Sequence, residues 1–204
     1  MSFAIATLNY NYLTMSAALA YQRPTYVTVE QYLAIEEKSP VRHEFVAGEM
    51  YALAGSTKYH NMICGNLFAD IHRHLRGKPC KPYMQDVKLQ IWAGQDVIYY
   101  PDLMVVCDPT DDEPVIARKP KVIIEVLSPS TRRIDEQEKL LTYFRIDSLE
   151  EYILAEQSVM TISIFRRANE WKREEVHGRD ALLELVSLGF SIPLISIYEG
   201  VFES

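Results

Sequence analysis

An almost continuous apolar run, interrupted by one carboxylate, lies at Lys121-Val122-Ile123-Ile124-Glu125-Val126-Leu127. Short apolar runs rich in β-branched residues are typical of strands buried on both faces of a sheet. A carboxylate inside such a strand is costly unless it has a cation or a metal as partner. We therefore expect an α/β fold with a functional group in the middle of its sheet.

The segments around this strand supply its neighbours. A capping box, Thr28-Val29-Glu30-Gln31, begins a helix over 28–37. Ile63, Leu67, Ile71 and Leu75 recur at helical spacing and predict a helix over 60–76, and a third helix is expected over 130–145. Strands are expected over 43–45 and 50–53 as a hairpin, and over 83–92, 97–107, 121–127, 152–155, 161–165, 170–176 and 182–187, where the last segment could also be helical.

This order predicts an α/β core with a mixed β-sheet flanked by helices, and with an N-terminal helix and hairpin in front of it. Residues 25–204 are interpreted as one domain. Residues 1–24 carry a single charge, Arg23, and are interpreted as a loose N-terminal arm, with Met15 as an alternative start. An apolar C-terminal segment, 192–202, is expected to cap the core.

Charge and cysteine content exclude several classes of protein. The formal net charge of −7 argues against a protein held to DNA by a bulk positive field. No apolar run approaches the length of a membrane span, so no membrane partner is expected. The scattered residues Cys64, Cys80 and Cys107 favour reduced thiols and a cytoplasmic location.

Two carboxylates and a lysine form the candidate site. Asp102, after Pro101, and Glu125 lie on strands expected to be neighbours, where they could share one Mg²⁺. A buried pair of Glu125 with a lysine or arginine is the plain alternative. Lys139 follows Asp135 by four residues on the next helix. The pair is either a surface ion pair or a lysine placed over the two carboxylates to orient or deprotonate a water.

A larger set of motifs at these spacings resembles one family. The set comprises Arg42-His43-Glu44, Gly48-Glu49, His60, Pro101-Asp102, Glu125-Val126-Leu127-Ser128-Pro129-Ser130-Thr131, Asp135, Lys139 and Tyr143. Over about residues 28–165 the chain resembles the Uma-two family, bacterial proteins assigned as candidate restriction endonucleases within the PD-(D/E)XK nuclease superfamily. The general nuclease pattern has a lysine two residues after the glutamate, whereas this chain has Leu127, which makes Lys139 the candidate for that role.

The resemblance implies a restriction-endonuclease-like core and a metal-dependent nuclease that hydrolyses phosphodiester bonds in DNA. Asp102 and Glu125 would bind Mg²⁺ or Mn²⁺, and Lys139 would position the attacking water. Glu44, His60, Ser128 and Asp135 are possible further site residues, with packing or helix capping as the plain alternative for His60.

The basic pair Arg132 and Arg133 is expected beside the site, on the DNA backbone. A homodimer would allow two strands to be cut. A non-catalytic nucleic-acid-binding or assembly module that retains the fold is the alternative function, which the acidic charge slightly favours.

Overall fold

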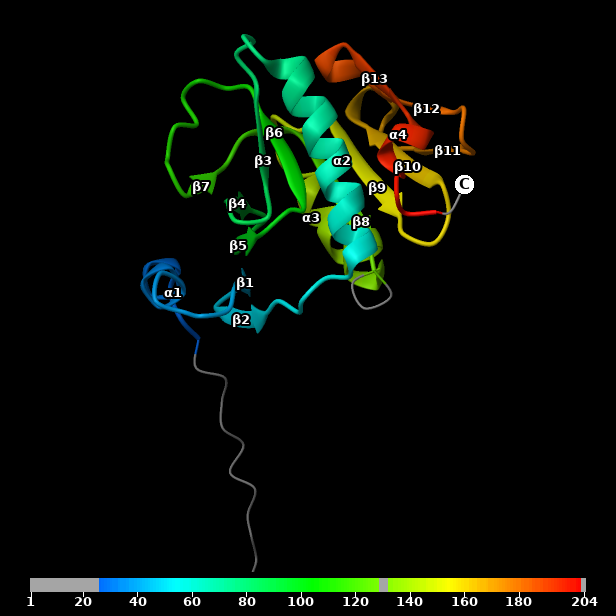
Figure 1. The fold of residues 1–204 in the computed structure, drawn as a ribbon. Coiled ribbons are helices and arrows are strands. Elements are labelled where there is room, and N and C mark those ends of the chain that lie inside the picture. The colour runs from blue at the N-terminus through cyan, green and yellow to red at the C-terminus, as the bar shows by residue number, and fades with distance from the viewer. Residues whose placement is uncertain (1–25, 129–131, 203–204) are drawn as a thin grey trace, which may run out of the picture.

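The computed structural model describes residues 26–128 and 132–202, which form two large sheets, one small sheet and the helices around them (Figure 1). The six-stranded sheet has the order β11-β10-β9-β8-β6-β3 and is mixed, because β8 and β9 are parallel and its other pairs are antiparallel. Its strands are β3 (Lys81–Met84), β6 (Leu103–Val106), β8 (Pro120–Leu127), β9 (Glu151–Glu156), β10 (Thr161–Arg166) and β11 (Arg173–His177).

The smaller sheets flank this core. The five-stranded sheet has the order β2-β1-β5-β4-β7, and β12 pairs with β13 in a two-stranded sheet. Their strands are β1 (His43–Val46), β2 (Glu49–Ala52), β4 (Lys88–Trp92), β5 (Asp96–Tyr99), β7 (Ile116–Ala117), β12 (Leu182–Leu185) and β13 (Phe190–Pro193). The helices are α1 (Val29–Glu36), α2 (Lys58–Leu75), the π-helix η1 (Ile134–Lys139), α3 (Leu140–Tyr143), the 3₁₀ turns η2 (Arg167–Asn169) and η3 (Val186–Leu188), and α4 (Leu194–Ile197).

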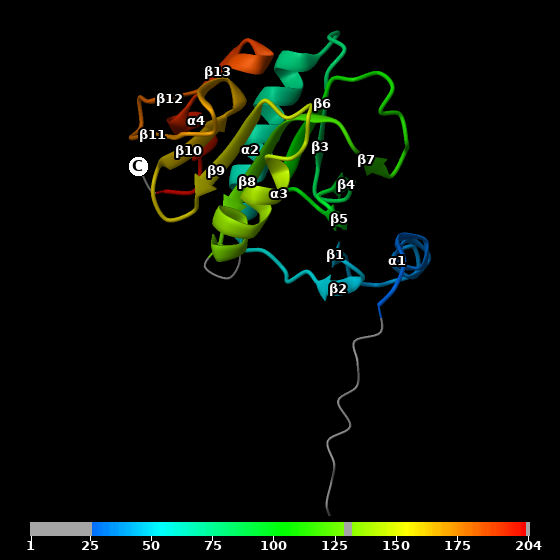
Figure 2. The ribbon, with the colours of Figure 1, turned by 180° about the vertical axis from the view of Figure 1, so that it is seen from behind.

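Alternation along β8 separates two apolar layers. Val122, Ile124 and Val126 pack in one core cluster with the buried face of α2. Ile123 and Leu127 point to the other side and pack with α3 and with the five-stranded sheet. The helices α2 and α3 accordingly lie on opposite faces of the six-stranded sheet, as the two views show (Figures 1 and 2). Glu125 has the parity of the second face, so its carboxylate points toward η1 and α3.

The mixed sheet flanked by helices is confirmed, as are the N-terminal helix and hairpin. Thr28 and Gln31 form both halves of the capping box at the start of α1. In the hairpin β1–β2, Ala47 and Gly48 have positive φ, which is the geometry of a tight two-residue turn. The expected caps of the third helix, Ser130 and Thr131, and the N-terminal arm 1–24 lie outside the described residues. Helical structure continues from residue 132 through η1 and α3.

Two expected strands are wrong in the same way. The segment 83–92 is not one strand, because the chain turns at Gln85, whose φ is +47°, and divides into β3 and β4. The segment 97–107 divides at Tyr100-Pro101-Asp102 into β5 and β6. In both cases the two halves belong to different sheets. The chain thus crosses from one sheet to the other at two neighbouring points, and the second crossing carries Asp102.

The expectation of reduced thiols is also wrong for two of the cysteines. Cys80 and Cys107 form a disulfide across a sequence separation of 27 residues, and Cys64 is the free, buried thiol. The physical reason is the strand register: Lys81 pairs with Val106, so the residues just outside this pair face each other across β3 and β6. The inference of a reducing compartment from cysteine content therefore loses its basis.

The C-terminal segment caps the core as expected, since Leu194, Ile197 and Tyr198 belong to the cluster that includes α2. Of the helices in the part of the chain that the structure describes, none combines the length and apolar character needed to cross a bilayer.

Candidate active site

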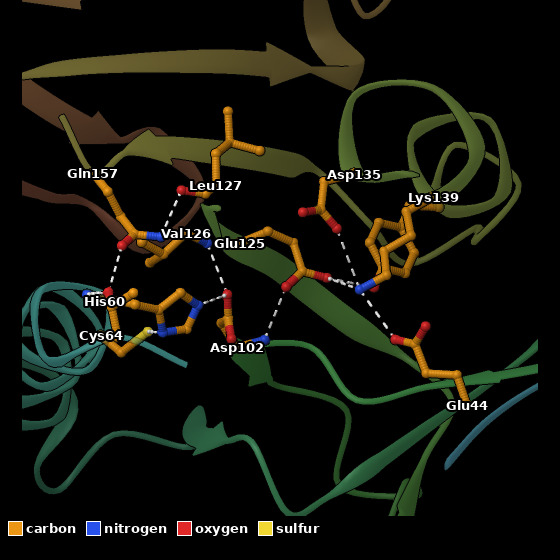
Figure 3. Close-up of polar contacts among 12 residues, drawn as sticks. Glu44, His60, Cys64, Asp102, Glu125, Val126, Leu127, Asp135, Lys139 and Gln157 are labelled. Atoms are coloured by element: carbon orange, nitrogen blue, oxygen red, sulfur yellow. Dashed lines mark hydrogen bonds and ion pairs between the residues drawn. The ribbon is translucent and has the colours of Figure 1, made fainter. Parts of the chain in front are cut away.

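Asp102 and Glu125 lie side by side because their strands pair. In the register of β6 and β8, Leu103 pairs with Ile124, which places the residue before β6 next to Glu125. The backbone N–H of Asp102 donates to Glu125 Oε2 at 3.0 Å, and the backbone N–H of Val126 donates to Asp102 Oδ2 at 2.8 Å (Figure 3). These two reciprocal bonds hold both carboxylates in one orientation. The paired carboxylates expected from the sequence are therefore brought together.

Lys139 points into the protein toward this pair. Its Nζ lies 3.2 Å from Glu125 Oε1, 3.1 Å from Glu44 Oε1 and 3.3 Å from Asp135 Oδ1 (Figure 3). Burial acts to lower the pKa of Lys139, but the charges of Glu125, Glu44 and Asp135 raise this pKa well above its usual range. The side chain is therefore an ammonium group. Since a protonated amine cannot accept a proton, the geometry supports an orienting role and not that of a base.

The carboxylate of Glu125 accepts hydrogen bonds at both of its oxygens. Tyr143 Oη donates to Glu125 Oε1 at 2.8 Å, in addition to the contact with Lys139. Burial raises the pKa of Glu125 to about 8; the Lys139 charge opposes this rise, and the charges of Asp102 and Asp135 add to it. A further positive charge near Glu125 would stabilise its ionised form.

His60 contacts the other carboxylate of the pair. It lies in the first turn of α2, where Thr57 Oγ1 accepts from the His60 N–H at 3.1 Å and caps the helix. His60 Nε2 is 3.0 Å from Asp102 Oδ2, and His60 Nδ1 is 3.6 Å from Cys64 Sγ. The ligand atoms of His60, Cys64 and Asp102 all lie within 4.8 Å of one another. Burial raises the pKa of the Cys64 thiol above its usual range, which makes it a poor source of thiolate for a metal.

One positioning residue, Gln157, has no signal in the sequence. It follows β9, and its amide nitrogen donates to the carbonyl of Leu127 at the end of β8, at 2.7 Å. Its amide oxygen accepts from Thr57 Oγ1, the cap of α2, at 2.6 Å (Figure 3). Gln157 therefore ties the helix that carries His60 to the strand that carries Glu125. It lies 100 residues from Thr57 in sequence, so only the fold relates the two.

The acidic residues line one cavity of about 310 Å³, together with His60, Ser128 and Lys139. Four carboxylates, those of Glu44, Asp102, Glu125 and Asp135, gather there. Lys139 and Arg42 are the cationic side chains that line the cavity among the described residues. This excess of negative charge is the setting that a hard divalent cation compensates.

The oxygen atoms present fit such a cation. The Asp102 side chain is 19% exposed, and its Oδ1 takes part in no hydrogen bond with the described residues. Glu125 Oε2 accepts one hydrogen bond, from the Asp102 N–H, which leaves a second lone pair on that oxygen. Both oxygens belong to residues that line the cavity. Asp102 and Glu125 could thus bind Mg²⁺ or Mn²⁺, both of which take oxygen ligands.

The expected DNA contacts, Arg132 and Arg133, do not line this cavity. Arg132 forms ion pairs with Glu156 and Glu136, and Arg133 forms one with Glu138. Arg132 is therefore held against Glu156, whose side chain is 13% exposed, whereas Arg133 and Glu138 form an exposed pair that water screens. The residues between Ser128 and Arg132 are outside the described part of the structure.

A family model matches most of the chain. The model named Uma2, with the description "Putative restriction endonuclease", matches residues 29–195. The chain belongs to the Uma2 family. The resemblance seen in the motifs is thereby confirmed, and the acidic cavity is the candidate active site of a Uma2 protein.

Two relatives from the cyanobacterium Synechocystis match most of the chain. "Uncharacterized protein slr1290" is 33% identical over 175 residues, which cover 84% of this chain and 91% of the relative. "Uncharacterized protein sll1609" is 29% identical over 163 residues, 78% of this chain and 92% of the relative.

A solved structure has the same fold. It is a protein from Anabaena variabilis described as a putative nuclease belonging to DUF820, with a TM-score of 0.71 and 14% identity. The match covers 86% of this chain and 99% of that protein. This likeness shows that the two proteins share one fold.

Proposed function

We propose that the chain is a metal-dependent nuclease that hydrolyses phosphodiester bonds in DNA. Membership of the Uma2 family and the nuclease-like fold support hydrolysis of this kind. The observation that carries the proposal is the meeting of Asp102, Glu125 and Lys139 in one cavity, from three elements far apart in sequence. A lysine that merely paired with Asp135 on a helix surface would be exposed, whereas the side chain of Lys139 is 8% exposed.

In this proposal Asp102 and Glu125 bind Mg²⁺ or Mn²⁺. The bound ion would lower the pKa of a coordinated water and polarise the phosphate. Lys139 acts as a fixed cation that orients the water and offsets negative charge on the phosphate. Tyr143 and Glu44 hold Glu125 and Lys139 in place through the contacts described above, and His60 does the same for Asp102.

The proposed homodimer and cytoplasmic location extend this function. Two copies with one cavity each would allow both strands of a duplex to be cut, and symmetric dimers are the commonest oligomers. Light scattering coupled to size exclusion measures the mass in solution, and a monomer mass would remove the dimer from the proposal. For location, fractionation of cells should recover the chain with cytoplasmic markers.

A cleavage assay tests the nuclease function. Plasmid DNA and single-stranded DNA are incubated with the wild type and with Asp102→Asn, in Mg²⁺, in Mn²⁺ and in a chelator. The wild type should cleave only with metal, and Asp102→Asn should lose cleavage by roughly 100-fold, since one ligand charge is missing.

The control is Asp112→Asn, which removes the same charge from an exposed position in the loop between β6 and β7. It should cleave like the wild type. Cleavage that survives in Asp102→Asn, or a wild type inactive with both metals and both substrates, would contradict the proposal. The second result would favour a non-catalytic binding or assembly module.

A further inference from the structure

We propose that Arg42 and Lys88, which flank the ring of Tyr100 at the edge of the acidic cavity, form the site that binds the phosphodiester backbone of the nucleic acid. This proposal rests on the proposed nuclease function and deepens it. It differs from the expectation drawn from the sequence, in which Arg132 and Arg133 contact the DNA backbone.

The two cations share one aromatic ring. The guanidinium carbon of Arg42 lies 5.9 Å from the ring centroid of Tyr100, and Nζ of Lys88 lies 5.5 Å from the same centroid. Both distances are within the range of cation–π attraction. The two positive charges therefore cannot be further apart than the sum of these distances, which makes them one local cationic patch.

Burial and a hydrogen bond hold the ring of Tyr100, which lies between the two cations, in place. Tyr100 is 6% exposed, and its hydroxyl donates to Glu36 Oε1 at 2.8 Å. Glu36 also accepts from the backbone N–H of His43 at 2.9 Å, and its other oxygen lies 3.0 Å from His43 Nδ1. The end of α1, the start of β1 and the end of β5 are thus tied together under the patch. A rigid ring gives both cations a defined place.

Arg42 connects the patch to the active site. It lines the same cavity as Asp102 and Glu125, and its Nη1 donates to the carbonyl of Gln85 at 2.9 Å. The same nitrogen pairs with Asp86, whose side chain is 86% exposed, so that the pair is screened by water. The described contacts of the Arg42 side chain run through Nη1 and the ring of Tyr100, which leaves Nη2 and Nε to reach a phosphate.

The charge balance favours this patch over Arg132 and Arg133, which precede η1. A cavity with four carboxylates repels a polyanion unless cations stand at its edge. Lys88 forms no ion pair with any residue in 26–128 or 132–202, whereas Arg132 is paired with Glu156, whose side chain is 13% exposed. Arg133 pairs with the exposed Glu138 and does not line the cavity. Lys88 can therefore meet a phosphate without first breaking a salt bridge.

Salt dependence of binding tests the proposal. Short fluorescein-labelled DNA and RNA oligonucleotides, single- and double-stranded, are titrated with wild type, Lys88→Gln and Arg42→Gln in Ca²⁺ across a series of salt concentrations. Loss of one phosphate contact should weaken binding about equally for all sequences and reduce the slope of log K against log salt by about 1. In cleavage assays, KM should rise in Lys88→Gln while kcat stays near the wild-type value.

Lys172→Gln is the matched control, since it removes the same charge from an exposed pair with Glu170. It should keep the wild-type slope. Thermal unfolding shows whether Arg42→Gln folds; if it does not, Lys88→Gln alone decides. A wild-type slope in Lys88→Gln, with binding and cleavage intact in the wild type, would overturn this inference and leave the nuclease function standing. A wild type that neither binds nor cleaves any probe would overturn both.

Discussion

Lys139 lies among three carboxylates: its Nζ donates a hydrogen bond to Glu125 Oε1 and forms ion pairs with Glu44 and Asp135. At the scale of single residues, this arrangement explains why the lysine can sit on the helix after β8 and not on β8 itself. The side chain reaches back from η1, and its charge ends beside Glu125. The position two residues after Glu125 is then free for Leu127, which packs in the core.

Replacement of Lys139 by methionine should destabilise the fold. It would leave the acids around it without their shared cation in a buried place, which typically costs about 3 kcal/mol or more. Urea unfolding of Lys139→Met measures this loss. Lys172→Met, which breaks an exposed pair with Glu170, should unfold like the wild type. Equal midpoints for the two variants would contradict the role of Lys139 as the shared partner.

Glu125 makes the stability of the metal-free protein depend on pH. Burial raises its pKa from 4.5 to about 8 in the folded state, so its protonated form is the one that folding favours. Its contribution to stability is full below pH 4.5 and is lost as the pH rises toward 8. In a chelator, the melting temperature should fall across this window. Glu125→Gln should flatten the profile, whereas an unchanged slope in that variant would show that another group is responsible.

At the scale of elements, the position of α2 determines where His60 lies relative to Asp102. Thr57 caps the helix, and Gln157 ties this cap to the end of β8. A shift at the N-terminus of α2 therefore moves His60 relative to the carboxylate pair. α1 has a cap of the same chemistry, Thr28, but in the described part of the chain this cap pairs with Gln31 and does not line the acidic cavity.

This difference gives a matched pair of variants. Thr57→Ala and Thr28→Ala should each cost about 1 kcal/mol of stability, because each removes one N-cap side chain. Only Thr57→Ala should also lower the rate of DNA cleavage, since it loosens the helix that holds His60. Denaturant unfolding and steady-state cleavage are measured on both. Equal loss of cleavage in the two variants would show that α2 has no special role.

The elements also show how far sequence patterns reach. Periodicity predicted α2 and β8 because each buries a regular face, and the Asp102–Glu125 pair followed from the expectation that their strands are neighbours. The two sheet crossings, at Gln85 and at Pro101, were missed because the halves on either side read as continuous strands. Gln157 and Lys88 were missed because their roles depend on contacts across the sequence, which local patterns do not carry. The Cys80–Cys107 disulfide likewise depends on the register between β3 and β6, which local patterns do not show.

At the scale of the whole molecule, charge is unevenly distributed. The chain has a net charge of −7, and four of its carboxylates gather in one cavity between the two large sheets and α2. Glu44 lies on β1, Asp102 directly precedes β6, Glu125 lies on β8 and Asp135 lies on η1. These elements come from different parts of the sequence. The fold thus concentrates acids at one place, where electrostatic repulsion must be offset.

Binding of Mg²⁺ should therefore stabilise the molecule as a whole. The melting temperature should rise with Mg²⁺ concentration, because a ligand that binds only the folded state shifts the unfolding equilibrium. Differential scanning calorimetry of wild type, Asp102→Asn and Asp112→Asn measures the effect. The rise should vanish in Asp102→Asn and persist in Asp112→Asn. A rise that persists in both would place the bound ion elsewhere.

Anomalous diffraction from a crystal of the protein soaked in Mn²⁺ would show directly whether Asp102 and Glu125 bind a divalent metal. The anomalous signal should show an ion that Asp102 Oδ1 and Glu125 Oε2 both coordinate, at about 2.0–2.4 Å. Lys139 should remain close to that carboxylate pair. An ion bound by His60 and Cys64 without Glu125, or no ion in the cavity at saturating Mn²⁺, would contradict the claim.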